Sequence, residues 1–190
     1  MSGTRILVFG GSLRTGSFSA KLAGLAAKEL SLLDAEVSLI SLGDYPLPIY
    51  DGDLEAQKGV PENAKKLRAM MNAQQGVYIA TPEYNASVPP LLKNAIDWVS
   101  RSGAGGPDPF KSRPFALGST SNGRFGGYRA LIALRQVLEL GLSALVLPNQ
   151  VAISGAAAAF DEAGGLKDEN LAKLLRESLT RLIRVAEAEI

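Results

Sequence analysis

The sequence predicts a doubly wound α/β fold, with a five-stranded parallel sheet in the order 2-1-3-4-5 and helices on both faces. Short apolar runs alternate along the chain with longer segments whose apolar residues lie three and four positions apart. The short runs are apolar at successive positions, which indicates strands that are covered on both faces. Five such runs suit this strand order, in which ligands bind beyond the carboxyl ends of the strands where the winding reverses.

The expected strands are the apolar runs 5–10, 36–41, 76–81, 113–119 and 142–147. The expected helices are the segments with helical spacing at 19–32, 61–73, 88–101, 126–140 and 167–189. The connection 42–61 is long and rich in proline, glycine and aspartate, so we interpret it as a rim or lid of the binding site. We expect one domain over residues 1–190, because no repeat and no change in composition marks a boundary.

The composition excludes several classes of function. The twenty basic and nineteen acidic residues leave a net charge of +1, which gives no field to attract nucleic acid or an anionic membrane. Cysteine and histidine are absent, which removes disulfides, thiolate nucleophiles, Cys/His zinc sites and imidazole bases. If the protein is an enzyme, we expect a bound cofactor to perform the chemistry, with no catalytic side chain and no metal. No apolar window reaches the roughly 18 residues of a membrane helix, so we expect a cytoplasmic protein.

Residues 8–20, VFGGSLRTGSFSA, join the first expected strand to the first expected helix through a loop rich in glycine and hydroxyl groups. Gly11 and the pair Gly16-Ser17 match the spacing of a nucleoside-triphosphate loop, G-x-x-x-x-G-K-[ST], but the lysine is missing. The G-x-G-x-x-G spacing of dinucleotide-binding loops is also absent. The loop therefore fits neither of these two nucleotide-binding motifs.

The donors of this loop suit a phosphate monoester instead. Hydroxyl groups and one guanidinium surround the expected amino end of the helix, where free backbone N–H groups also favour an anion. The side chains concerned are Ser12, Arg14, Thr15, Ser17 and Ser19. The alternative is a glycine-rich connection with a serine cap, which accounts for one serine and one glycine and leaves the other donors unexplained.

Residues 81–87, TPEYNAS, follow the third expected strand and form a second polar loop. Pro82 restricts the backbone, while Tyr84 and Asn85 place a ring and an amide at the crevice, where a planar heteroaromatic ligand would bind well. An ordinary turn capped by Ser87, at the start of the helix 88–101, explains the same residues equally well. The third loop, 119–124, again presents hydroxyls, an amide and a glycine, and is weak evidence by itself.

Three stretches of the sequence carry a resemblance to a known family. They are GSLRTGSFSAKLA near the amino terminus, TPEYNASVPPLLKNAIDWVSR in the middle and GSTSNGRFGGYRAL after the fourth expected strand. They resemble the NADPH-dependent FMN reductases, a flavodoxin-like family that includes quinone, azo-dye and chromate reductases. The similarity runs from about residue 4 to residue 155, and the PEYNxSxPxxLKNAIDW block is its most specific part.

The resemblance implies noncovalent FMN, with its phosphate in the first loop and its isoalloxazine ring against the second and third loops. The residues expected to bind the cofactor are Ser12, Arg14, Ser17, Phe18 and Ser19 in the first loop, Pro82, Glu83, Tyr84 and Asn85 in the second, and Ser119, Ser121 and Gly123 in the third. Many relatives carry asparagine at the position of Ser19, so the role of this serine is open. Relatives are usually dimers or tetramers, in which the helix after the second loop contributes to the interface.

The resemblance further implies an NAD(P)H-dependent oxidoreductase that passes electrons through FMN to a small-molecule acceptor by a ping-pong mechanism. Quinones, azo compounds, chromate, ferric chelates and free flavins all remain open as acceptors. NADPH and NADH are not distinguished, although Arg14, Arg101 and Arg124 are candidates for contact with a 2'-phosphate. The alternatives are a flavodoxin-type electron carrier, which the net charge of +1 argues against, and a receiver-like module, whose aspartate cluster these loops lack.

Overall fold

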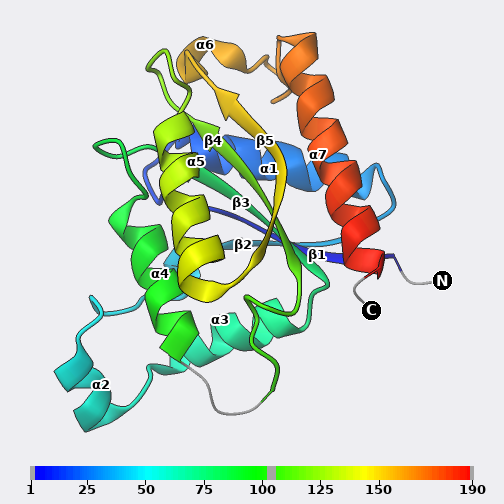
Figure 1. Cartoon of the computed structure of the whole chain (residues 1–190). Coiled ribbons are helices and arrows are strands. Elements are labelled where there is room, and N and C mark those ends of the chain that lie inside the picture. Colours follow the sequence, from blue (N-terminus) through cyan, green and yellow to red (C-terminus); the bar gives the residue numbers. More distant parts are fainter. Residues whose placement is uncertain (1–2, 102–105, 189–190) are drawn as a thin grey trace.

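The strands form one parallel sheet in the order β2-β1-β3-β4-β5, as the sequence predicts (Figure 1). This computed structural model describes residues 3–101 and 106–188. The strands are β1 Arg5–Gly10, β2 Glu36–Ser41, β3 Gly76–Pro82, β4 Pro114–Thr120 and β5 Leu145–Ile153. The central strands β1, β3 and β4 are buried along almost their whole length, whereas the edge strand β2 is only partly covered.

Helices cover both faces of the sheet (Figure 1). On each face, an apolar core lies between the sheet and the helices. The longer helices are α1 Phe18–Ser31, α3 Glu62–Asn72, α4 Pro90–Arg101, α5 Tyr128–Arg135 and α7 Glu169–Ala188. Because successive strand residues point to opposite faces, Ile6 and Val8 pack with α1 and α7, while Leu7 and Phe9 pack with α3, α4 and α5. Among the described residues, no helix is both long enough and apolar enough to cross a membrane.

The fifth strand is the element that the sequence places least well. It runs over Leu145–Ile153 rather than 142–147, because Pro148 does not end it. The pairing of β4 with β5 shifts register between Phe115 and Leu117, and such irregularities tolerate a proline, which cannot donate to a regular ladder. Ser143, which the prediction placed inside the strand, has a left-handed backbone with φ of 56° and lies in the turn before it.

Three short elements were not predicted, namely the 3-10 turn η1 Leu42–Asp44 and the helices α2 Gly52–Lys58 and α6 Ala156–Ala159. The predicted helix 126–140 is present as α5 and the π-helical turn η2 Gln136–Gly141 that continues it. None of the residues of α2 is buried, and Asp51 caps this helix by accepting from two backbone N–H groups. Short exposed helices of this kind have no apolar stripe that a sequence pattern could detect.

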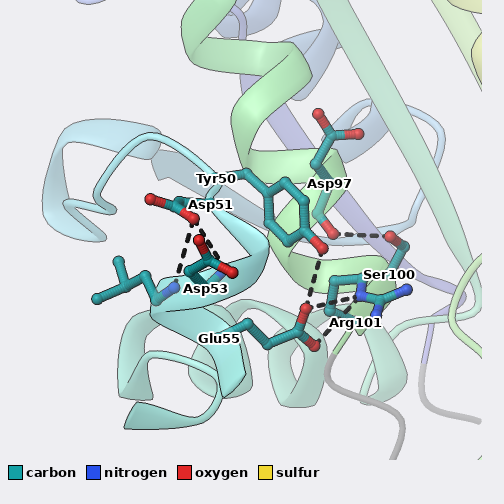
Figure 2. A network of polar contacts seen from close by, with 8 residues as sticks. Tyr50, Asp51, Asp53, Glu55, Asp97, Ser100 and Arg101 are labelled. Atoms are coloured by element: carbon teal, nitrogen blue, oxygen red, sulfur yellow. Dashed lines mark hydrogen bonds and ion pairs between the residues drawn. The ribbon is translucent and has the colours of Figure 1, made fainter. Parts of the chain in front are cut away.

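The connection after β2 was expected to be a rim or lid, and its later part lies against α4 rather than over the polar loops, whereas Asp44 at its start lines a surface pocket together with Ser12 of the first loop. The backbone N–H of Tyr50 donates to Asn94 at 2.8 Å, and its hydroxyl donates to Glu55 at 2.9 Å. Figure 2 shows the same carboxylate accepting from Arg101, whose Nε lies 3.0 Å away. Arg101 ends α4, and Pro90 at the other end of α4 follows the second polar loop, so α2 lies a helix length away from that loop.

Candidate functional site

A cavity of about 150 Å³ lies at the carboxyl ends of β1, β3 and β4, where the three polar loops converge. Its lining residues are Ser12, Arg14, Ser17, Phe18 and Ser19 from the first loop, Pro82, Glu83 and Tyr84 from the second, and Thr120, Ser121 and Asn122 from the third. The structure therefore brings together most of the predicted residues of the first and second loops, although Thr15, named as a phosphate donor, does not line the cavity. Asn85, Ser119 and Gly123, which were also predicted, do not line this cavity.

The first loop is fixed to the sheet and to the start of α1. The backbone N–H of Gly11 donates to the carbonyl of Ala80 in β3 at 2.8 Å, and Gly16 turns the chain with a φ of 70°. Ser17 then caps α1, since its side-chain oxygen accepts from the backbone N–H of Ala20 at 3.4 Å. The Ser17 and Ser19 hydroxyls lie 2.9 Å apart. The helix start thus presents hydroxyls and free backbone N–H groups to one side of the cavity.

Two cationic side chains lie beside Phe18, a residue of the first loop that lines the cavity. The guanidinium of Arg14 lies 5.7 Å from the centre of the Phe18 ring, and the ammonium of Lys21 lies 5.8 Å from the same ring. Among the described residues, no carboxylate forms an ion pair with Arg14. Its charge is therefore available to an anion in the cavity.

The second loop is a tight turn, which corrects one local prediction. Tyr84 and Ser87 exchange two backbone hydrogen bonds of 3.0 and 3.1 Å, and the two residues between them have positive φ. Ser87 therefore closes the turn and does not cap α4, which begins at Pro90. Asn85 lies at the exposed tip, which is why it does not line the cavity. The hydroxyl of Tyr84 lies 3.4 Å from that of Ser12, so the turn contacts the first loop.

In the third loop, two predicted residues support the turn and two others line the cavity instead. Ser119 is fully buried, and its hydroxyl donates to the carbonyl of Gly126 at 2.8 Å. Gly123 donates its N–H to the Ser121 side chain at 3.1 Å. Thr120 and Asn122, which the sequence reasoning missed, lie on the cavity wall. Their position immediately after the predicted end of the fourth strand is the signal that could have identified them.

The carboxylate of Glu83 connects the second loop to α5. Its side chain is 6% exposed, and it accepts from Nε of Arg129 at 2.8 Å and from the backbone N–H of Arg129 at 3.2 Å, with a further ion pair to Nη2. The residue before α5 is Gly127, which has no side chain to cap the helix. The carboxylate of Glu83, although it belongs to a different loop, therefore accepts from a backbone N–H in the first turn of α5, as a capping side chain would.

The donors around the cavity fit FMN. A phosphate ester needs a cation and several N–H or O–H donors, and the first loop supplies both at a helix start. The hydroxyl of Thr120 is buried and has no hydrogen-bond partner among the described residues, as expected for a group that a bound ligand would satisfy. Within the same residues, no group of acidic side chains is arranged to hold a metal ion.

A polar cavity between the first and third strands of a 2-1-3-4-5 sheet defines the class of flavodoxin-like mononucleotide-binding proteins. Within that class, a family model described as NADPH-dependent FMN reductase matches residues 4–158. The chain belongs to the NADPH-dependent FMN reductase family. The predicted NAD(P)H- and FMN-dependent oxidoreductase is thereby confirmed at the level of the family.

Individual relatives agree with this assignment. An NAD(P)H-dependent FMN reductase of Pseudomonas aeruginosa is 37% identical over 183 residues, which cover 94% of this chain and 92% of that protein. A quinone reductase of Escherichia coli K12 is 41% identical over 139 residues, covering 72% of this chain and 70% of the relative. The flavoenzyme FerB of Paracoccus denitrificans, an NAD(P)H:(acceptor) oxidoreductase, superposes with a TM-score of 0.81 at 32% identity, with 98% of each chain covered.

Proposed function

We propose that the protein reduces quinones or other soluble acceptors with electrons from NADPH or NADH, through FMN held in the cavity described above. The observation that carries the proposal is the convergence of three loops on one cavity that combines serine hydroxyls, the start of α1 and an arginine, Arg14, that pairs with no carboxylate among the described residues. When bound, FMN accepts a hydride and releases electrons to the acceptor, chemistry for which this chain has no side chain of its own.

The first loop would hold the FMN phosphate. Arg14 provides the charge, Ser12, Ser17 and Ser19 provide hydroxyls, and the aromatic ring of Phe18 supports the guanidinium. Ser19 is 1% exposed, so its short side chain adds one hydroxyl at the base of the cavity.

The second and third loops would shape the site of the flavin ring. Pro82 and Tyr84 form one wall, and Thr120, Ser121 and Asn122 form the other. Backbone and hydroxyl donors in these walls can stabilise negative charge on the ring. Glu83 is already engaged by Arg129, so its carboxylate does not serve as a proton donor in this proposal.

We further propose a ping-pong order, in which the nicotinamide and then the acceptor use one open face beside Tyr84, a side chain that is 44% exposed. A flavodoxin-type carrier is the alternative, but such carriers usually meet their partners through an acidic face. This cavity has the opposite character, because Arg14 lines it, Lys21 lies against the Phe18 ring that also lines it, and Glu83 is neutralised by Arg129.

The site also limits which arginines could contact the 2'-phosphate of NADPH. Arg101 pairs with Glu55 at the far end of α4, so it is a poor candidate within the same chain. Arg14 and Arg124 remain as candidates, and Arg124 lies over Phe125 with 5.4 Å between the guanidinium and the ring centre.

We propose a homodimer or homotetramer, with α5 as part of the contact. The solvent face of α4 is polar, since Lys93 and Asp97 form an ion pair on it. By contrast, α5 and the turn that follows it expose Tyr128, Ile132 and Leu140. Exposed apolar side chains on one helical face are typical of an interface.

Titration of the apoprotein with FMN, followed by steady-state assays with both nicotinamides and a panel of acceptors, tests the proposed function. We expect one FMN per chain, and turnover with at least one quinone. Tight FMN binding without turnover of NADPH or NADH would favour the electron carrier, and the absence of FMN binding would refute the proposal.

A further inference from the structure

The contact between Glu83 and Arg129 lies at the edge of the candidate flavin site and carries a consequence for the flavin itself. Glu83 lines the cavity, although only 6% of its side chain is exposed. Both of its carboxylate oxygens are occupied, one by the guanidinium of Arg129 and the other by the backbone N–H of Arg129. A carboxylate this deep in the site is tolerable because a charged partner holds it.

The two members of the pair come from different walls of the cavity. Glu83 belongs to the turn after β3, and Arg129 belongs to the first turn of α5, which follows the third loop. The guanidinium of Arg129 also lies 5.4 Å from the centre of the Phe125 ring, which restricts its position from the other side. The ion pair therefore sets the spacing of the two loops between which the ring would lie.

The opposite charges of Glu83 and Arg129 cancel. This cancellation affects bound FMN, because the charge of FMN itself changes when it is reduced. Reduced FMN is more negative than oxidised FMN, so a nearby unpaired carboxylate would disfavour the reduced form and an unpaired guanidinium would favour it. The other charged side chain that lines the cavity, Arg14, comes from the first loop and forms no ion pair with Glu83 among the described residues.

We propose that Glu83 and Arg129 are a positioning pair that holds the second loop against the third and keeps their two charges cancelled, so that neither charge shifts the reduction potential of bound FMN. This inference rests on the proposed function, because it requires FMN in the cavity. The pair acts through the cancellation of its two charges and through the loop spacing, and neither residue transfers a proton.

The test compares the midpoint potential of bound FMN in Glu83→Gln, Arg129→Gln and the double variant, measured by equilibration with a reference dye. Glu83→Gln leaves a cation without its partner and should raise the potential. Arg129→Gln leaves a buried carboxylate without its partner and should lower it. The double variant removes both charges and should return the potential close to that of the parent.

Binding of FMN to the apoprotein provides a second, independent readout. Arg129→Gln should weaken binding by about tenfold or more, because it removes charge-assisted hydrogen bonds that position the turn. Arg129→Lys keeps the charge but loses the forked geometry, so it should weaken binding while leaving the potential near that of the parent. This variant keeps the test decisive if Arg129→Gln fails to fold.

Glu29→Gln is the matched control, because Glu29 forms an equivalent ion pair with Arg176 at 2.7 Å between α1 and α7. It should change neither the potential nor the FMN affinity. Potentials that shift in the same direction in both single variants, or in neither, would overturn the inference while FMN binding by the parent preserved the proposed function. Failure of the parent apoprotein to bind FMN would refute the proposed function itself.

Discussion

The hydroxyls of Ser17 and Ser19 lie 2.9 Å apart in the first turn of α1, and both side chains are more than nine-tenths buried. Ser17 thus has two partners, because its oxygen also caps the helix by accepting from Ala20. The pair links the stability of the helix start to the surface that the phosphate of FMN would meet. It also gives Ser19 a structural role that its short side chain alone does not suggest.

Ser17→Ala should therefore destabilise the apoprotein more than Ser19→Ala does. The first change removes a helix cap and leaves the Ser19 hydroxyl without its partner, for a loss of about 1–2 kcal/mol in the free energy of unfolding. The second change leaves the cap in place. Urea unfolding of both apoproteins measures the difference, and equal losses would mean that the cap contributes little.

Arg14→Ala should weaken FMN binding more than any single serine substitution in the first loop. A charged hydrogen bond contributes about 1.5–3 kcal/mol against roughly 1 for a neutral one, which corresponds to a difference in affinity of about tenfold. Arg14 has no competing carboxylate among the described residues, so its guanidinium is free to meet the phosphate. Titration of the apoproteins with FMN tests this order. Unchanged affinity in Arg14→Ala would instead direct attention to an anionic group of the nicotinamide nucleotide.

Tyr78 offers a prediction about alkaline stability. Its hydroxyl is buried against Gly118 without a hydrogen-bond partner among the described residues, and burial raises the pKa of the phenol. Between the ordinary phenol pKa of about 10 and the higher pKa in the folded protein, only the unfolded chain ionises. Stability should therefore fall as the pH rises through this range, by up to about 1.4 kcal/mol per pH unit.

Tyr78→Phe should not show this fall, and at neutral pH it should be at least as stable as the parent, because an unsatisfied hydroxyl is lost. The free energies of unfolding of the two proteins are compared at each pH. Burial lowers the pKa of Arg113 to about 10, but Arg113 is present in both proteins, so its contribution cancels in the difference. Chemical unfolding at pH 7, 10 and 11 gives the three differences required. Parallel loss of stability in both proteins would show that the phenol of Tyr78 ionises in the folded state.

Self-association should depend on the exposed face of α5. Ile132 is 52% exposed on this helix, and Leu174 on α7 is 47% exposed, so the two residues form a matched pair of surface positions. Ile132→Glu should shift the mass measured by light scattering at micromolar concentration toward the monomer, whereas Leu174→Glu should leave the oligomer intact. A parent protein that is strictly monomeric with FMN bound would contradict the proposed assembly.

Much of the fold follows from periodicity, because buried parallel strands and amphipathic helices leave strong patterns. β5 was misplaced because Pro148 normally ends a strand, whereas β5 is an edge strand whose pairing with β4 shifts register near the proline, and both features tolerate proline. The missing helix α2 buries nothing, so its sequence has no apolar stripe. Boundaries that depend on tertiary pairing are not encoded in local patterns.

The candidate site was predictable where its residues follow one another within a single loop. Hydroxyls and an arginine before a helix are a local signal, and all these residues except Thr15 line the cavity. The turn that carries Asn85 was not predictable, because an alanine occupies its second left-handed position, where glycine is the usual signal. The contact of Glu83 with Arg129 joins residues 46 positions apart, and only the folded chain brings them together.

The order of substrate binding can be tested by steady-state kinetics. We expect double-reciprocal plots at several fixed acceptor concentrations to give parallel lines, because one open face beside Tyr84 would serve NAD(P)H and the acceptor in turn. Glu83→Gln should retain most of the turnover rate, since the carboxylate is engaged by Arg129 and the flavin carries out the redox step. Tyr84→Ala should raise the KM for the nicotinamide more than it lowers kcat, because it removes part of the wall on which that ring would stack. Intersecting lines would mean that both substrates bind at once, and a large loss of kcat in Glu83→Gln with FMN still bound would make the carboxylate a participant in the reaction.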